Sequence, residues 1–223
     1  MILSGMHLQN IFNKMELIKD YFPELTERQI DQFQHLGELY KEWNQKINVI
    51  SRKDIDNVYD NHILHSMAIA RFVQFLPEAE ILDLGTGGGL PGIPMAILFP
   101  ETTFTLIDGT RKKITVVQEI IQALDLKNAK AMHMRAEELK GPKFDFVICR
   151  AVASLDKLIN WSFRLIKNKQ QHLVPNGLIT LKGGNLKDEI NELPKGHYID
   201  MQPLSDFFEE EYFEEKFVVY AQY

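Results

Sequence analysis

The stretch ILDLGTGGGLPGIP, residues 81–94, decides the fold of this chain. Residues 81–84 form a short, mainly apolar run that is typical of a buried strand, and it leads into the glycine-rich turn 85–89. A second apolar segment, residues 93–99, has the pattern of a helix. A strand, a glycine turn and a helix in this order bring backbone N–H groups and a helix N-terminus to one point, where glycines let a ligand approach closely. We therefore expect the binding site there.

The chain continues from this stretch as short apolar runs that alternate with helical segments. Such alternation is typical of a parallel α/β sheet with right-handed crossovers. The tail departs from it, because residues 197–204 and 217–223 leave no room for a crossover helix, and we expect them to pair as an antiparallel hairpin at one edge of the sheet. The other strands we expect are 81–84, 103–108, 129–134, 144–149 and 178–181, and the helices 93–98, 112–124 and 155–166.

The residues before the sheet predict three helices. A capping box at Thr26–Gln29 begins the second helix, which extends to Trp43, and the third covers about residues 55–75. The first helix ends before Pro23 and has apolar residues at helical spacing: Leu8, Ile11, Phe12, Met15 and Ile18. We predict an N-terminal helical extension, residues 1–77, packed on an α/β domain, residues 78–223, as one compact unit.

Composition and charge narrow the class of protein. The hydrophobic fraction of 45% and charged fraction of 25% are those of an ordinary globular chain. Its single cysteine, Cys149, lies in an apolar run, where we expect it to pack rather than react. No apolar stretch has the length of a membrane span, and the first residues lack the pattern of a signal peptide. We expect a cytoplasmic protein with no membrane partner.

A net charge of −6 argues against a nucleic-acid partner by charge attraction alone. The segment 206–215, however, contains six acidic residues and no basic one. Basic clusters occur elsewhere, and on an acidic chain such clusters are more often solvated helix faces than nucleic-acid contacts. They are Arg111, Lys112 and Lys113, and a second group of Lys157, Arg164, Lys167 and Lys169.

A glycine-rich turn after the first strand occurs in dinucleotide-binding domains and also in S-adenosylmethionine (SAM) methyltransferases. The spacing Gly85-x-Gly87-x-Gly89 differs from the dinucleotide pattern G-x-G-x-x-G. Residues 85–92 contain no cation, and SAM has no phosphate that would need one. The antiparallel tail is also typical of the methyltransferase version of the sheet. These features favour SAM, with an NAD-dependent enzyme as the alternative.

Polar residues at predicted strand ends are the candidate ligand contacts. Asp108 can accept the ribose hydroxyls of an adenosine, or it can cap the helix that follows. Asp83, inside the first strand, is better placed to hold the turn than to touch a ligand. Ala136 and Glu137 follow the third strand and either flank an adenine or simply begin a helix. Arg150 ends the fourth strand and is directed at the site, because ligands of open α/β sheets bind at such ends.

Four segments together resemble one family: KEWNQKINVIS (41–51), NHILHS (61–66), GTGGGLPGIP (85–94) and FDFVICRAVASL (144–155). The chain resembles the bacterial 16S rRNA guanine-N7 methyltransferases RsmG, formerly glucose-inhibited division protein B, from about Tyr40 to Asp188. The resemblance implies an α/β, Rossmann-like class I methyltransferase fold. It also implies SAM as cofactor, S-adenosylhomocysteine as product and N7 of one 16S rRNA guanosine as acceptor. The rRNA itself, the small subunit or an assembly intermediate would be the partner, and no oligomer is expected.

The resemblance implies SAM contacts at Gly85, Leu90, Ala136, Glu137 and Arg150. To these we add Asp108, from its place at a strand end, and Gly87 and Gly89, from the glycine spacing. The chain departs from the family pattern where Gly88 replaces a proline and His65 replaces an aspartate. It departs again in residues 109–113, Gly-Thr-Arg-Lys-Lys, where the family more commonly has a serine and a leucine.

Methylation of guanine N7 makes modest chemical demands. N7 has an available lone pair, so we expect no catalytic acid or base, and catalysis by proximity and orientation. Candidate RNA contacts are Arg111, Lys112, Lys113 and His62. We expect no metal site, because His62 and His65 have no third ligand at a plausible spacing. The rival hypotheses are a non-catalytic ribosome-assembly protein and a SAM enzyme that acts on a small molecule.

Overall fold

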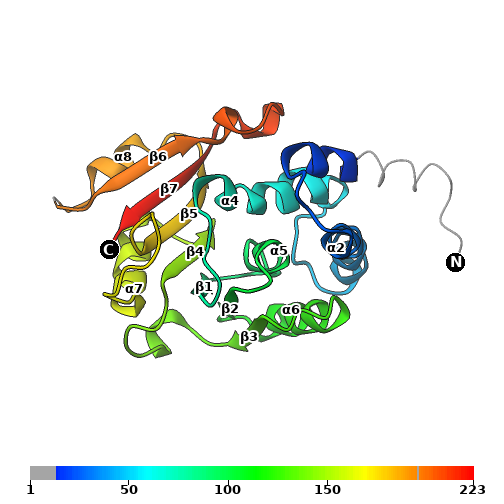
Figure 1. The fold of residues 1–223 in the computed structure, drawn as a ribbon, viewed down its shortest axis with the longest axis horizontal. Helices are drawn as coiled ribbons and strands as arrows, with labels where there is room; N and C mark the ends of the chain where they lie inside the picture. The colour runs from blue at the N-terminus through cyan, green and yellow to red at the C-terminus, as the bar shows by residue number, and fades with distance from the viewer. Residues whose placement is uncertain (1–13, 195) are drawn as a thin grey trace, which may run out of the picture.

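The computed structural model describes residues 14–194 and 196–223. Within these residues seven strands form one sheet in the order β3-β2-β1-β4-β5-β7-β6 (Figure 1). The strands are β1 (Glu80–Leu84), β2 (Thr103–Asp108), β3 (Ala129–His133), β4 (Phe146–Arg150), β5 (Gly177–Gly183), β6 (Ile199–Pro203) and β7 (Lys216–Gln222). All the predicted strands are present. β4 begins two residues later than predicted because Phe144 makes only an isolated bridge, to Ile166.

The strand order places a switch point at the glycine turn. β1 pairs in parallel with β2 on one side and with β4 on the other. Successive strands are therefore added to one side of β1 up to β3 and to its other side from β4 onward. Ligands of open α/β sheets bind outside the carboxyl ends of the strands at such a point. The predicted tail hairpin is confirmed: β6 and β7 are antiparallel, and β7 also pairs antiparallel with β5.

The helices cover both faces of the sheet. The predicted capping box is present, since Thr26 and Gln29 exchange hydrogen bonds at the start of α2. α7 ends earlier than predicted, and the 3-10 turn η4 (Phe163–Leu165) continues it. The longer helices are α2 (Glu27–Lys46), α5 (Gly92–Leu98), α6 (Arg111–Ala123), α7 (Leu155–Ser162) and α8 (Lys187–Asn191).

The prediction of one continuous helix over residues 55–75 is wrong. The segment is divided into η1 (Ile55–Asn57), η2 (Val58–Leu64), α3 (His65–Met67) and α4 (Ile69–Phe72). η2 is a π-helix, and the amide of the residue after it reaches back five positions, to the carbonyl of Asp60. Apolar spacing carries no signal for such an extra residue per turn. Short π-helical segments are rare and frequently occur at functional sites.

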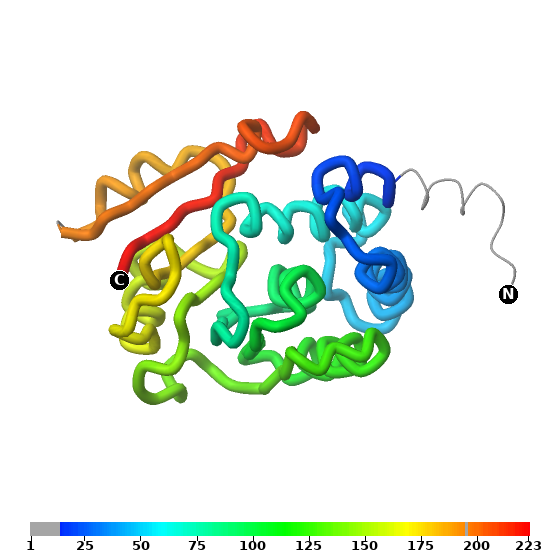
Figure 2. The backbone as a smooth tube through the Cα atoms, in the orientation of Figure 1, coloured from blue at the N-terminus to red at the C-terminus, as the bar shows by residue number. Residues whose placement is uncertain are grey.

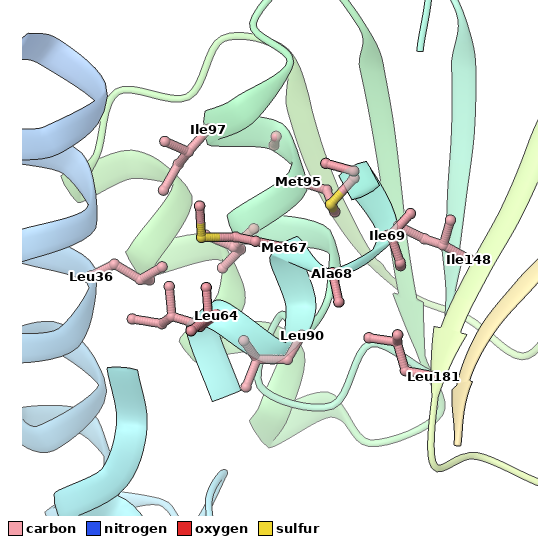
Figure 3. Packing of buried hydrophobic residues seen from close by; sticks show 14 of the residues in the cluster. Leu36, Leu64, Met67, Ala68, Ile69, Leu90, Met95, Ile97, Ile148 and Leu181 are labelled. Carbon is pink, nitrogen blue, oxygen red and sulfur yellow. The ribbon is translucent and has the colours of Figure 1, made fainter. Parts of the chain in front are cut away.

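The N-terminal helices share a hydrophobic core with one face of the sheet. Figure 3 shows Leu36 of α2 beside Leu64 and Met67, with Ile148 of β4 and Leu181 of β5 in the same cluster. The helical residues 14–21 add Met15 and Ile18 to this core, whereas Leu8, Ile11 and Phe12 lie outside the described residues. A second cluster, which includes Cys149, lies between the other face and α7.

The acidic segment between β6 and β7 folds back onto the first helix. Figure 2 shows this orange-to-red segment close to the blue helical residues 14–21. The rings of Tyr21 and Phe208 meet at 4.8 Å between centroids, and the Tyr21 hydroxyl lies 3.2 Å from both Glu210 carboxylate oxygens. Across the described part of the chain, no helix is both long and apolar enough to cross a membrane.

Candidate cofactor site

Asp83 holds the glycine turn from inside the sheet, as the sequence predicts. Its Oδ2 accepts hydrogen bonds from the Thr86 hydroxyl at 2.5 Å and from the Gly92 amide at 2.8 Å. Oδ1 is buried with no hydrogen-bond partner among the described residues. Burial raises the pKa of this carboxyl to about 7, although the bonds from Thr86 and Gly92 oppose that rise. A carboxyl that sits behind the turn supports its geometry and does not face a ligand.

Close packing requires several glycines of the stretch, Gly85 and Gly92 among them. A Cβ on Gly92 would lie 2.5 Å from Asp83 Oδ2, and one on Gly85 would lie 2.8 Å from a methyl of Val152. Gly85 also has a φ of 71°, which side chains rarely adopt. These glycines therefore let α5 and the turn after β4 approach the end of β1.

The N-terminal extension also contacts the glycine turn. The Tyr40 hydroxyl, on α2, donates to the Gly88 carbonyl at 2.9 Å. Gly88 is the position where the family usually has proline, and a Cβ there would lie 2.8 Å from Val49 Cβ. The departure from the family pattern thus coincides with close packing of the extension on the turn.

Asp108 joins the end of β2 to the same turn. Its Oδ2 accepts from the Gly87 amide at 3.0 Å, and its Oδ1 accepts from the Thr110 amide at 2.7 Å. The second bond closes the turn before α6, but Asp108 is not the N-cap of that helix, which is Thr110. Each oxygen keeps a second lone pair, so the carboxylate can still accept hydroxyl groups.

A cavity of about 340 Å³ lies at the carboxyl ends of β1, β2 and β3. It brings together four of the predicted contacts, Gly85, Asp108, Ala136 and Glu137. Apolar side chains, with the carboxylates of Asp108 and Glu137 beside them, suit an uncharged adenosine. The remaining lining residues are Leu84, Ile107, Gly109, Met134, Arg135, Val152 and Trp161.

Three of the predicted contacts, all in the turn after β1, do not line this cavity. Leu90 is buried in the core with 4% of its surface exposed. A Cβ on Gly89 would lie 2.4 Å from the side chain of Ile93, so this glycine packs against α5. Gly87 donates its amide to Asp108. These residues shape the turn, and the structure shows them in no wall of the cavity.

Sequence reasoning missed several residues that build the cavity. Val152 and Trp161 come from the turn after β4 and from α7, and an aromatic residue at helical spacing gives no sign of facing a ligand. Arg164 donates to the carbonyl of Leu139 at 2.6 Å and also to that of Ala136, which fixes the turn η3 (Ala136–Glu138). Lys167 of the same basic cluster is paired with Asp145 at 3.1 Å. Both cations thus serve the fold.

Arg150 and His62 meet at a second cavity of about 430 Å³, at the carboxyl ends of β4 and β5. The turn of residues 150–152 separates the two cavities, since Arg150 and Ala151 line this one and Val152 lines the other. Ala151 has a φ of 52°, an uncommon conformation for a residue with a side chain. The predicted contact Arg150 therefore borders the cofactor cavity without lining it.

The structure gives His62 partners inside the protein. Its Nε2 lies 2.5 Å from Asp54 Oδ2, and its Nδ1 lies 3.1 Å from Arg150 Nη2. Burial and the nearby Arg150 charge lower the pKa of His62 to about 4, against the opposing effect of Asp54. Neither ring nitrogen is left for RNA, so this geometry disfavours the RNA contact that the sequence suggested.

The cluster Arg111, Lys112 and Lys113 forms the first turn of α6, directly after Asp108 and Thr110. Arg111 and Lys112 are exposed, and this turn contains no acidic residue. Within the described residues, no group of His, Cys, Asp and Glu has the arrangement of a metal site. A cavity of about 630 Å³ lies elsewhere, between the start of α2 and the end of α5, and none of the predicted site residues lines it.

The strand order, the glycine turn and the carboxylate at the end of β2 define a class I SAM-dependent methyltransferase. Two solved structures share this fold. One is precorrin-6y C5,15-methyltransferase from Geobacter metallireducens (TM-score 0.53, 11% identity, 78% of this chain and 90% of that one). The other is a SAM-dependent methyltransferase from Aquifex aeolicus (TM-score 0.51, 16% identity, 74% and 92%). At such identities they show the fold alone.

Sequence similarity gives the family. Residues 29–208 match the GidB family, described as rRNA small subunit methyltransferase G. A relative called ribosomal RNA small subunit methyltransferase G, from Bacteroides thetaiotaomicron, is 54% identical over 93% of this chain and 100% of its own. One of the same name from Flavobacterium johnsoniae is 52% identical over 92% and 97%. The chain belongs to this family of methyltransferases.

Proposed function

We propose that this enzyme transfers the methyl group of SAM to N7 of one guanosine in 16S rRNA. The observation that carries the proposal is the match of residues 29–208 to an rRNA methyltransferase family. It is supported by the cavity that joins Gly85, Asp108, Ala136 and Glu137 at the switch point of the sheet. When bound, SAM supplies a methyl group already activated by a sulfonium.

The residues of the first cavity suit the adenosine part of the cofactor. Asp108 keeps lone pairs for the two ribose hydroxyls after its backbone bonds are made. The apolar side chains of Met134, Val152 and Trp161 form walls for a flat purine, with Ala136 and Glu137 at its edge. Gly87, Gly89 and Leu90 act through the shape of the turn.

The chain needs no general base for this reaction. N7 of guanine carries its own lone pair, and the methyl transfer needs it to be aligned with the sulfonium. Asp83 is not a base here, because it lies behind the turn and is fully buried. We therefore assign no catalytic acid or base, and assign the rate enhancement to orientation.

The first turn of α6 is the proposed contact with RNA. Cations at a helix N-terminus are disfavoured by the helix dipole, and Arg111, Lys112 and Lys113 have no acidic residue in that turn to offset them. A phosphate group beside this turn would relieve that repulsion, because helix N-termini and cations both favour anions. The turn begins beside the cofactor cavity, so RNA bound there can reach it.

We further propose that the partner is cytoplasmic 16S rRNA, free or in the small subunit or its precursor. Residues 1–77 and 78–223 would act as one unit on it. The shared core of α2, α3, α5 and the sheet supports this, as does the bond from Tyr40 to Gly88.

The function is tested with purified enzyme, SAM and 16S rRNA or small subunits from a strain that lacks this methylation. Nuclease digestion and mass spectrometry should find 7-methylguanosine at one position. Transcripts made with 7-deazaguanosine, which lacks N7, should accept no methyl group. Methylation of the deaza transcript would overturn the choice of atom. No methylation of any RNA form, with SAM bound, would favour the rival hypotheses.

A further inference from the structure

Arg150 is a partly buried cation in the wall of the second cavity, and its contacts are neutral. Its Nη1 donates to the carbonyls of Asn61 and His62 at 3.4 and 3.5 Å, and its Nη2 donates to His62 Nδ1 at 3.1 Å. Among the described residues no carboxylate forms an ion pair with it. Lys182, which lines the same cavity, is by contrast paired with Glu189 at 2.6 Å. Arg150 thus keeps a charge that no contacting group neutralises.

The hydrogen-bond directions of His62 are fixed by Asp54. A carboxylate only accepts, so the ring nitrogen 2.5 Å from Asp54 Oδ2, Nε2, carries the hydrogen. Nδ1 of the neutral ring then has a lone pair, which faces the guanidinium. Asp54 Oδ1 in turn accepts from Asn61 Nδ2 at 2.7 Å. A negative charge, a neutral ring and a positive charge therefore follow one another in a chain of defined donors and acceptors.

The backbone around the hydrogen-bonded residues Asp54, His62 and Arg150 is irregular. Asn61 and His62 lie in the π-helical turn η2, and both of their carbonyls accept side-chain donors. The Tyr212 hydroxyl donates to the Asn61 carbonyl at 3.0 Å, and the Ser66 hydroxyl donates to the His62 carbonyl at 2.6 Å. On the other side, the left-handed Ala151 turns the chain away immediately after Arg150. Both backbones that meet here are thus irregular.

We propose that Asp54 and His62 are positioning residues that hold the Arg150 guanidinium, still charged, for the carboxylate of the amino-acid part of the cofactor. The inference rests on the proposed function, in which the adenosine part fills the neighbouring cavity. SAM has a single carboxylate, and the turn 150–152 forms a wall of both cavities. A carboxylate in direct contact with Arg150 would cancel its charge, whereas a neutral imidazole between them fixes the guanidinium and leaves the charge available.

The experiment compares two ligands by calorimetry. S-adenosylhomocysteine carries the carboxylate, and 5′-methylthioadenosine keeps the adenosine without the amino-acid part. Arg150→Ala and His62→Ala should each raise the Kd for S-adenosylhomocysteine about tenfold, because a hydrogen-bonded charge contact is lost or misplaced. Neither should change the Kd for 5′-methylthioadenosine. Damage to the fold would instead weaken both ligands.

Two isosteric variants of His62 test the two hydrogen bonds of its ring separately. In His62→Asn the amide oxygen takes the place of Nδ1, so the bond from Arg150 is kept and affinity should stay within about threefold of the native enzyme. In His62→Gln the amide nitrogen takes the place of Nε2, so only the bond to Asp54 is kept and affinity should fall as in His62→Ala. The matched control is His35→Ala, since His35 also faces an aspartate, Asp31, at 3.6 Å but on an exposed helix face.

The double variant completes the test. In an Arg150→Ala background, His62→Ala should cause no further loss of S-adenosylhomocysteine affinity. Additive losses, or equal losses for both ligands, would overturn the positioning role. If Arg150→Ala alone weakens S-adenosylhomocysteine, only the assignment of His62 fails. If the native enzyme binds neither ligand, the proposed function itself fails.

Discussion

The turn after β1 and the turn after β4 lie side by side at the switch point, but they are held by hydrogen bonds of opposite kinds. Backbone amides donate to carboxylates in the first, where Gly92 bonds to the buried Asp83 and Gly87 bonds to Asp108. In the second, a cation donates to carbonyls and to the neutral ring of His62. The first turn is built almost entirely within one stretch of sequence, and the second needs residues from distant segments. The two turns should therefore respond differently to substitution and to pH.

The largest effect should come from Asp83→Asn. Because burial raises the pKa of Asp83 to about 7, its contribution to stability is complete below the unfolded pKa of 3.8 and is lost as pH rises through 7. The loss is on the order of 4 kcal/mol at about 1.4 kcal/mol per pKa unit. In Asp83→Asn the free energy of unfolding, measured in urea from pH 4 to 8, should lack this decline. An unchanged pH profile would show that Asp83 ionises as an ordinary carboxyl.

Gly92→Ala should lower the free energy of unfolding by about 3 kcal/mol, because the new Cβ would crowd the Asp83 carboxylate and break hydrogen bonds of the turn. The control is Gly87→Ala, whose Cβ would meet no atom within 4 Å but whose φ is 58°. Gly87→Ala should lower the free energy of unfolding by about 1 kcal/mol, from backbone strain alone. Urea denaturation at pH 7 compares them, and equal losses would contradict the packing explanation.

His62→Gln should show the opposite pH behaviour to Asp83→Asn. The pKa of His62 is lowered to about 4, so its contribution is present above the unfolded value of 6.5 and is lost as pH falls through 4. That loss is about 3 kcal/mol by the same conversion, and the variant should lack it. If His62→Gln and His35→Gln gave the same pH profile, the buried neutral ring would not be the cause.

The smallest effect should come from the contact between the extension and the first turn. Tyr40→Phe leaves the buried Gly88 carbonyl without its donor and should cost about 1 kcal/mol. Tyr59→Phe removes a similar bond, to the Gln34 carbonyl at 2.9 Å, away from the turn. Both should lower stability equally, but only Tyr40→Phe should also weaken SAM binding by calorimetry. Equal binding by the two variants would mean that the extension does not act on the turn.

The same contrast explains what could be predicted from the sequence. The stretch 81–94 is local, so its strand, turn and helix, and the role of Asp83, follow from spacing and from glycine chemistry. The edge hairpin follows in the same way from the short connection between β6 and β7. Asp108, Ala136 and Glu137 line one cavity because the strand ends of a parallel sheet converge, which the sequence pattern predicts.

The missed features depend on contacts between distant segments. Nothing in the spacing of residues 55–75 marks the π-helical turn η2, in which the carbonyl of Asn61 accepts from Arg150 and Tyr212. Trp161 has the spacing of a core residue and lines the cavity because α7 packs beside the end of β4. The sequence suggests His62 as an RNA contact, and it gives no sign of the two partners inside the protein that disfavour this role.

The position of β7 has a consequence for how this chain is made. β7 follows β6 in the chain but lies between β5 and β6 in the sheet. A ribosome therefore completes β5 and β6 before the strand that joins them exists. Until residues 216–222 emerge, Leu178, Ile179 and Leu181 belong to an unpaired strand edge, the kind of surface that captures other chains. Between the synthesis of β5 and that of β7, nascent copies on one messenger can therefore pair with one another through this strand edge.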